Sequence, residues 1–215
     1  MKNEKCILLF SGGRDSTLSS VLLSKQFEYI HLITIKSVHL KGLENVYTRL
    51  KILQPFLQGK CSWELYRKIE NIPLKRLKIT TCLPCHAYYI ALLQCLARSQ
   101  NIKNVSLGYV GYQNCWEEQS PYAKNSLREY LANKGINLIL PVEDIQTKDD
   151  MKQALKDLGL PEEASEQKCL KSSFNIPLNP SEIEEQVDAW ILSIEQIYKI
   201  IQEKYTSTLI DTLKL

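Results

Sequence analysis

Short apolar runs and segments with helical periodicity alternate along most of this chain. The run over residues 6–10 has the length and composition of a buried strand, and the apolar positions that follow it suit one face of a helix. The same reasoning predicts strands over residues 29–37, 62–69, 105–110 and 136–142. Helices are predicted over residues 17–25, 44–57, 84–98 and 122–133, and a further helix begins at Thr147, with Asp150 as its capping partner.

This alternation predicts an α/β fold. We expect a doubly wound, Rossmann-like parallel sheet of five strands with helices on both faces, because parallel strands need crossover helices to return the chain. Ligands of such sheets bind outside the carboxyl ends of the strands.

The last part of the chain predicts one long helix. Asn179, Pro180 and Glu182 have the pattern of a helix start, and an apolar stripe follows up to Ile201. We therefore divide the chain into a domain over residues 1–175 and a C-terminal helical extension over residues 176–215. The stripe packs on the core in the first interpretation and forms a homodimer interface in the second.

The hexapeptide Ser11-Gly12-Gly13-Arg14-Asp15-Ser16 lies between the first predicted strand and the first predicted helix. Paired glycines let the backbone turn sharply and let a ligand approach, and the helix start offers unpaired N–H groups. The motif therefore predicts a phosphate site. Asp15 is either a Mg²⁺ ligand or a simple helix cap. The motif lacks the Gly-Lys-Ser/Thr of a Walker A loop.

Three cysteines form the second candidate site. Cys82 and Cys85 make a CxxC directly before a predicted helix, where a thiolate at Cys85 is favoured, and Cys169 lies in a later loop that can fold back over the same sheet edge. A CxxC can be a zinc half-site, a redox pair or a sulfur carrier, and three thiolates can also hold an iron–sulfur cluster with one open position. A silent, partly buried set of thiols is the remaining alternative.

Composition narrows the class of protein. The chain of 215 residues is 44% hydrophobic and 24% charged, with a net charge of +3, which permits nucleic-acid binding without requiring it. Its apolar runs are too short to span a bilayer, and its first residues do not form a signal peptide. We therefore expect no membrane partner and a cytoplasmic location, where the seven cysteines serve as core residues, ligands or nucleophiles rather than disulfides.

The hexapeptide resembles the SGGxDS signature of the PP-loop ATP pyrophosphatases, in the adenine nucleotide alpha-hydrolase-like superfamily. The resemblance implies that Ser11, Gly12, Gly13, Arg14, Asp15 and Ser16 bind ATP with Mg²⁺, and that the enzyme adenylates a carbonyl-type oxygen and releases pyrophosphate. It implies that backbone groups near Thr34 and Ile35 flank adenine and that Gly108 borders the site. Asp15 and Lys148, the latter in a threonine-lysine segment, would assist catalysis.

The cysteine spacing resembles that of the tRNA thiolation enzymes, a subset of this superfamily. The resemblance implies that Cys82, Cys85 and Cys169 hold a [4Fe-4S] cluster, or that Cys169 carries sulfur to a tRNA base, with a sulfur donor protein as a partner. The chain length is closer to that of the 7-cyano-7-deazaguanine synthases, which would imply zinc and an ammonia-using ligase acting on a small nucleobase-like molecule. A module that senses ATP or AMP without turnover is the third alternative. Glu117 and Glu118 could take part in Mg²⁺ binding or lie on the surface, and we favour the surface. Arg49 is expected to be a surface residue of its helix.

Overall fold

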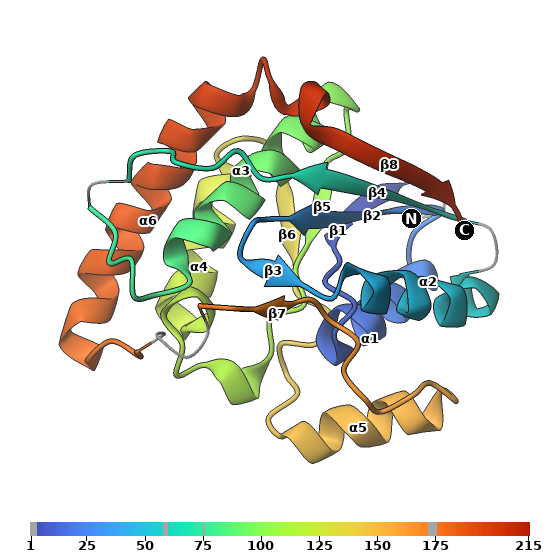
Figure 1. The fold of residues 1–215 in the computed structure, drawn as a ribbon. Coiled ribbons are helices and arrows are strands. Elements are labelled where there is room, and N and C mark those ends of the chain that lie inside the picture. Colours follow the sequence, from blue (N-terminus) through green and yellow to red (C-terminus); the bar gives the residue numbers. More distant parts are fainter. Residues whose placement is uncertain (1–3, 58–59, 75, 172–175) are drawn as a thin grey trace.

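Six strands form the main sheet, in the order β6-β5-β1-β2-β4-β8 (Figure 1). The computed structural model describes residues 4–57, 60–74, 76–171 and 176–215. The strands are β1 (Lys5–Leu9), β2 (Tyr29–Lys36), β4 (Cys61–Arg67), β5 (Asn104–Ser106), β6 (Asn137–Ile139) and β8 (Leu209–Lys214).

Five of these strands are parallel, as predicted from the pattern. β1 pairs with β2 and β5, β2 pairs with β4, and β5 pairs with β6, all in parallel register. The sixth strand, β8, pairs antiparallel with β4 and was not predicted. Every residue of β8 is exposed, so the strand lacks the buried apolar face by which the other strands can be recognised.

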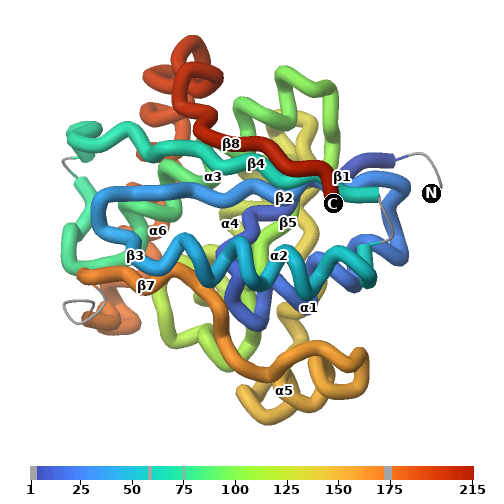
Figure 2. The backbone as a smooth tube through the Cα atoms, turned by 45° about the vertical axis from the view of Figure 1, so that its right-hand side comes forward, coloured from blue at the N-terminus to red at the C-terminus, as the bar shows by residue number. Residues whose placement is uncertain are grey.

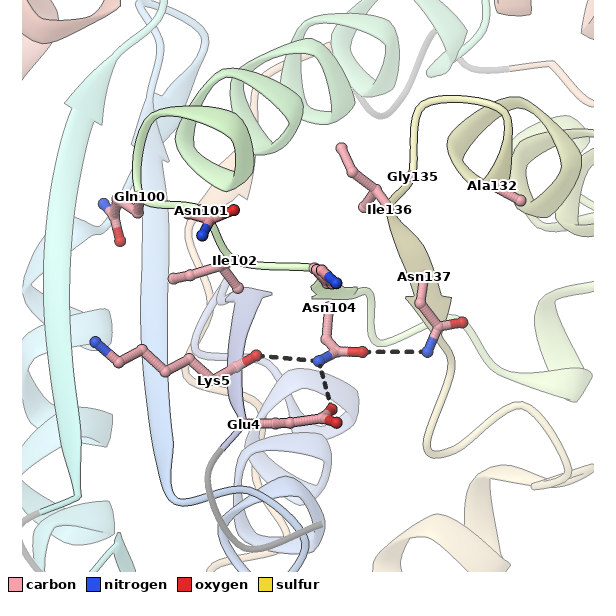
Figure 3. A pocket seen from close by; sticks show the side chains of 11 residues that line it. Glu4, Lys5, Gln100, Asn101, Ile102, Asn104, Ala132, Gly135, Ile136 and Asn137 are labelled. Atoms are coloured by element: carbon pink, nitrogen blue, oxygen red, sulfur yellow. Dashed lines mark hydrogen bonds between the residues drawn. The ribbon is translucent and has the colours of Figure 1, made fainter.

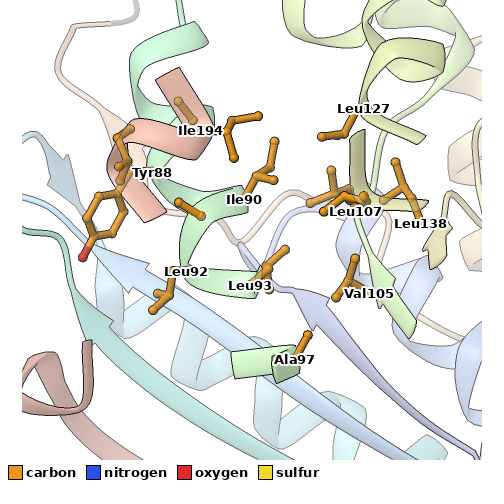
Figure 4. Packing of buried hydrophobic residues seen from close by; sticks show 14 of the residues in the cluster. Tyr88, Ile90, Leu92, Leu93, Ala97, Val105, Leu107, Leu127, Leu138 and Ile194 are labelled. Atoms are coloured by element: carbon orange, nitrogen blue, oxygen red, sulfur yellow. The ribbon is translucent and has the colours of Figure 1, made fainter. Parts of the chain in front are cut away.

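Helices cover both faces of the sheet, which confirms the predicted layering. One face carries α1 (Arg14–Ser24), α2 (Leu43–Leu57) and α5 (Lys148–Asp157). The other carries α3 (Leu83–Ser99), α4 (Pro121–Ala132) and α6 (Pro180–Ile201). Figure 4 shows the core of this second face, where side chains of α3 meet those of β5, β6, α4 and α6.

The apolar stripe of α6 packs on the core. Val187, Trp190, Ile194, Ile197 and Ile201 are fully buried in the cluster that contains α3. The first interpretation of the stripe is therefore confirmed, and these side chains are unavailable to a second copy of the chain. The domain boundary predicted after residue 175 borders residues 172–175, which lie outside the described residues. The C-terminal region contributes β8 to the sheet as well as a helix.

A second, two-stranded ribbon lies beside the carboxyl edge of the main sheet. β3 (Leu40–Lys41) follows β2 and pairs antiparallel with β7 (Lys168–Cys169), which follows α5. Figure 2 shows the chain returning from α5 past α1 and α2 to reach β7. We call residues 161–169, which make this return, the strap.

None of the helices in the described parts of the chain is long and apolar enough to cross a membrane.

Candidate nucleotide and thiol site

The site lies where the order of the strands reverses. From β1 the chain runs outward through β2 to β4 and then crosses to β5 on the other side of β1. The loops after β1 and β5 therefore diverge outside their carboxyl ends, which is the usual ligand position in open α/β sheets. The Ser11–Ser16 hexapeptide occupies the first of these loops.

The hexapeptide is a braced turn at the start of α1. Gly12 has a φ of +82°, a conformation that favours glycine, and Gly13 is the N-cap of the helix. The Ser11 and Ser16 hydroxyl oxygens lie 3.2 Å apart, and the Gly13 amide donates to Ser11 Oγ at 3.2 Å. Because Gly13 has no side chain to cap the helix, the amides at its start can serve an anion.

Gly108 supports this turn from the neighbouring strand. A Cβ built on Gly108 would lie 3.0 Å from the Ser16 amide nitrogen and 3.1 Å from the Asp15 carbonyl carbon, and both are backbone atoms. The residue therefore lets β5 end directly against the start of α1. The strand stops at Ser106, earlier than the pattern predicts.

Asp15 is held by a tyrosine from the loop after β5. The Tyr112 hydroxyl donates a 2.6 Å hydrogen bond to Asp15 Oδ1. Burial raises the pKa of Asp15, and this hydrogen bond acts against the rise. Since Gly13 is the N-cap, the structure removes the helix-cap interpretation of Asp15. The carboxylate remains beside the loop, in a position to meet a phosphate-bound cation.

Lys148 begins α5, and a hydrogen bond three residues earlier holds this part of the chain beside the loop after β5. The Gly111 amide donates to the Ile145 carbonyl at 2.9 Å, which places the start of α5 beside the loop that carries Tyr112. Thr147 caps α5 as predicted, accepting from the Asp150 amide at 3.0 Å. Lys148 is the first residue of that helix and is exposed.

Thr34 and Ile35, the two residues predicted to flank adenine, differ in their hydrogen bonds. Thr34 is buried, and its hydroxyl donates to the Phe10 carbonyl at 2.6 Å and accepts from Trp63 Nε1 at 2.8 Å. Its side chain therefore links β2 to its neighbours on both sides. The Ile35 carbonyl lies beyond the last residue of β2 that pairs with β1, and it accepts from Gln167 Nε2 of the strap at 3.1 Å.

Arg49 anchors the strap, and its predicted surface position is wrong. The residue is 0% exposed, and its guanidinium donates to the carbonyls of Pro161, at 3.2 Å, and Glu163. A longer contact of 3.4 Å reaches Ser165 Oγ. The spacing contained the signal: Arg49 lies three positions after Val46 and four before Leu53, on the buried stripe of α2.

The anchored strap lies directly over the phosphate loop. A Cβ on Gly12 would lie 2.5 Å from the Ser165 carbonyl oxygen, and one on Gly13 would collide with the Glu166 carboxylate. Glu166 as a residue is exposed, but its carboxylate is turned inward against the loop. Loss of water there raises its pKa, and the charge of Asp15 adds to the rise.

The three predicted thiols gather in one neighbourhood. Cys82 is the N-cap of α3, Cys85 lies in the first turn of that helix, and Cys169 in β7 pairs with Leu40. Burial raises the pKa of Tyr89, and the charges of Cys85, Cys169 and Cys82 all raise it further. Each of the three thiols is therefore close enough to act on one tyrosine.

Their arrangement does not fit a metal site. Within the described ranges, no group of three or more cysteine, histidine, aspartate or glutamate side chains is placed to hold a metal ion. The prediction that the start of α3 favours a Cys85 thiolate disagrees with the direction of its pKa shift. Burial raises the pKa of Cys85, and the charge of Cys169 acts in the same direction against Lys68 and Lys171.

Two carboxyl groups in the loop that follows β5 are buried, so the prediction that they lie on the surface is wrong. Glu117 is 1% and Glu118 is 5% exposed, in a short 3-10 turn after β5. Both carboxylate oxygens of Glu117 and Oε2 of Glu118 have no hydrogen-bond partner among the described residues. Burial raises the pKa of Glu118 to about 7. No periodic pattern marks these positions in the sequence.

Comparisons with known proteins agree with this geometry. No protein-family model matches the chain. The 7-cyano-7-deazaguanine synthase of Helicobacter acinonychis is 26% identical, over 74% of this chain and 79% of the relative. That of Helicobacter pylori is 25% identical, with coverage of 74% and 78%.

Two solved structures share the fold. A 4-thiouridine synthetase, in complex with RNA and bound ATP, superposes with a TM-score of 0.62 at 19% identity over 91% of this chain. The chain spans only 53% of that protein. The U34-tRNA thiolase NcsA of Methanococcus maripaludis, with its [4Fe-4S] cluster, gives a TM-score of 0.56 at 18% identity and coverage of 94% and 73%.

The parallel sheet, the glycine-rich loop at its switch point and these relatives make the chain similar to proteins of the adenine nucleotide alpha-hydrolase-like superfamily. Within that superfamily, the relatives that it resembles are a 7-cyano-7-deazaguanine synthase and enzymes of tRNA thiolation.

Proposed function

We propose that this protein is an ATP- and Mg²⁺-dependent enzyme that adenylates a carbonyl-type oxygen and releases pyrophosphate. The observation that carries the proposal is the Gly12-Gly13 turn, which presents the start of α1 at the switch point of the sheet. Ser11 and Ser16 supply hydroxyls there, and Asp15 supplies a carboxylate for a cation. The loop has no Walker A lysine, which favours adenylation over phosphoryl transfer.

The proposed first step balances as follows. The acceptor oxygen attacks the α-phosphorus of ATP, an O–P bond forms, and the bond from that phosphorus to the bridging oxygen breaks. The electron pair leaves on pyrophosphate. The amides at the start of α1, with Ser11 and Ser16, stabilise this developing charge, and Lys148 adds a cation from the start of α5.

We propose sulfur as the second reactant. The gathering of Cys82, Cys85 and Cys169 around Tyr89 supports this choice. A persulfide on Cys169 would displace AMP, forming a carbon–sulfur bond and breaking the carbon–oxygen bond to the nucleotide. The Cys85 thiolate would then attack Cys169 Sγ and break its bond to the transferred sulfur, which leaves on the product as a thiocarbonyl. The resulting Cys85–Cys169 disulfide needs an external dithiol as reductant, and the persulfide needs a sulfur donor protein.

The acceptor that we propose is a tRNA base or a related nucleobase. An ammonia-using ligase that acts on a small acid is the second candidate, and the 26% identity to a 7-cyano-7-deazaguanine synthase favours it. Nitrogen would then displace AMP, and none of the three cysteines would be required.

Product analysis tests both candidates. Wild-type protein is incubated with labelled ATP and Mg²⁺, with either bulk tRNA and a persulfide donor or a deazapurine carboxylic acid and ammonia. AMP and pyrophosphate are expected in the first mixture, whereas ADP and phosphate would reject adenylation. A variant that replaces Cys82, Cys85 and Cys169 by serine separates the candidates. Full activity of that variant would exclude sulfur transfer through these thiols and support the ammonia-using ligase.

A [4Fe-4S] cluster or zinc on the same three cysteines is the alternative drawn from the family. The described thiols do not form its ligand set, so no reaction step is assigned to it. Iron and zinc analysis of anaerobically purified protein tests the alternative. A brown protein that loses its colour on Cys169→Ala would support a cluster on these cysteines and reject the persulfide route.

A further inference from the structure

The strap places three consecutive residues in the space where the proposed ATP would lie. Ser165 packs its carbonyl on Gly12, Glu166 places its carboxylate against Gly13, and Gln167 bonds the Ile35 carbonyl. These contacts reach from the phosphate loop to the end of β2. That is the path which a nucleotide would follow from its phosphates to its base.

The chemistry of the contacts resembles that of a nucleotide. A carboxylate at the start of α1 is an anion in a phosphate seat. A side-chain amide N–H that donates to the Ile35 carbonyl is equivalent to the exocyclic amine of adenine, which donates in the same way. The burial that raises the pKa of Glu166 agrees with a carboxylate held against the loop rather than in solvent.

Two attachments hold the strap in this position. Upstream of Ser165, the buried Arg49 guanidinium binds the carbonyls of Pro161 and Glu163. Downstream, β7 pairs with β3, so that Cys169 lies opposite Leu40. Cys169 is only two residues from Gln167, and a movement of the strap therefore moves this thiol relative to Cys85 in α3.

We propose that Ser165, Glu166 and Gln167 are an internal occupant of the ATP seat, held there by Arg49 as a positioning residue, and that ATP must displace them and thereby reposition Cys169. The inference rests on the proposed function and adds a regulation of the same site. The thiol chemistry would wait for nucleotide, because Cys169 takes its working position only when the strap has left the seat.

An internal occupant lowers the apparent affinity for ATP, because the intrinsic affinity is multiplied by the fraction of molecules in which the seat is open. Removing the Glu166 carboxylate should therefore tighten ATP binding. If Glu166 were instead a ligand of the Mg²⁺ that accompanies ATP, the same change would weaken binding. The two roles predict opposite signs, which makes the residue a sharp test.

The first measurement is the dissociation constant of Mg²⁺–ATP by equilibrium dialysis. Glu166→Ala is compared with wild type and with Glu162→Ala, which removes the same charge from the same strap away from Gly13. We expect Glu166→Ala to bind ATP roughly fivefold tighter or more and Glu162→Ala to match wild type. Equal or weaker binding by Glu166→Ala overturns the inference while leaving the ATP site in place. Absence of ATP binding in all three proteins rejects the proposed function and the inference together.

The second measurement follows Cys169 directly. Wild-type protein is pulsed with iodoacetamide with and without Mg²⁺–ATP, and modification is mapped by mass spectrometry. We expect ATP to change the rate at Cys169 several-fold. In Arg49→Lys, which loses the guanidinium fork, the rate without ATP should already be close to the wild-type rate with ATP. A Cys169 rate that ATP leaves unchanged in wild type and in Glu166→Ala rejects the coupling, whether or not Arg49→Lys folds.

Discussion

The amino edge and the carboxyl edge of the main sheet differ in how far their polar side chains are hydrogen-bonded. At the amino edge, a hollow of about 820 Å³ is lined by residues of β1, β5 and β6 and the turns before them (Figure 3). Three of its polar side chains bond one another: Asn104 Nδ2 donates to Glu4 Oε2 at 3.0 Å, and Asn137 Nδ2 donates to Asn104 Oδ1 at 3.2 Å.

The carboxyl edge has the opposite character. The strap packs against Gly12 and Gly13, and Gly108 is crowded by backbone atoms. The carboxyl groups of Glu117 and Glu118 are buried, with oxygens that have no hydrogen-bond partner among the described residues. Buried polar groups without partners cost free energy, so they mark places where stability has been given up. The comparison teaches that the edge with the candidate site is the filled one with unpartnered polar groups, while the open hollow lies at the edge where a row of polar side chains is paired.

The largest expected effect concerns the buried carboxyl of Glu118. Its pKa is about 7 when folded and near 4.5 when unfolded, so the folded state holds a proton that the unfolded state releases between these values. The contribution to stability is complete below about pH 4.5 and is lost as the pH rises to about 7, by up to about 3 kcal/mol. Glu118→Gln should remove this loss in urea unfolding at pH 5 and pH 8. Glu129→Gln, at an exposed position, is the control. If Glu118→Gln kept the pH dependence of wild type, the claim that the buried Glu118 carboxyl destabilises the carboxyl edge at high pH would be wrong.

The next effect compares one glycine from each edge. Gly108→Ala places a methyl group against the backbone of Ser16 and should cost about 2 kcal/mol of stability and abolish pyrophosphate release. Gly135→Ala at the amino edge meets open space, and only its φ of +73° is unfavourable, at about 1 kcal/mol. Urea unfolding and pyrophosphate assays check the pair. Equal losses of activity in both variants would remove the distinction between the edges.

The smallest effect concerns single hydrogen bonds. Tyr112→Phe removes the donor to Asp15 and should lower kcat/KM for ATP about tenfold with little loss of stability. Asn104→Ala breaks the amino-edge row and should cost about 1 kcal/mol of stability, with ATP binding unchanged. Steady-state kinetics and thermal unfolding of both variants separate the two effects. A lower ATP affinity in Asn104→Ala would show that the edges are coupled.

Much of this arrangement could be predicted from local patterns. The five parallel strands, the phosphate turn and the Thr147 cap follow from apolar runs, paired glycines and capping residues that act over a few positions. The strap could not, because it depends on Arg49 meeting carbonyls 112 and 114 positions away. The burial of Glu117 and Glu118 was missed for a related reason, since tertiary packing and not a local period decides it.

The β3–β7 ribbon has a consequence for which parts of the protein open first. Only two residue pairs join its strands, and both Leu40 and Cys169 are half-buried. Separating them exposes little apolar surface, whereas separating β1 from β2 would expose fully buried leucine and isoleucine side chains. The ribbon therefore belongs to the regions that open by local unfolding at low free energy, with fast-exchanging amides, while the sheet behind it keeps its protection.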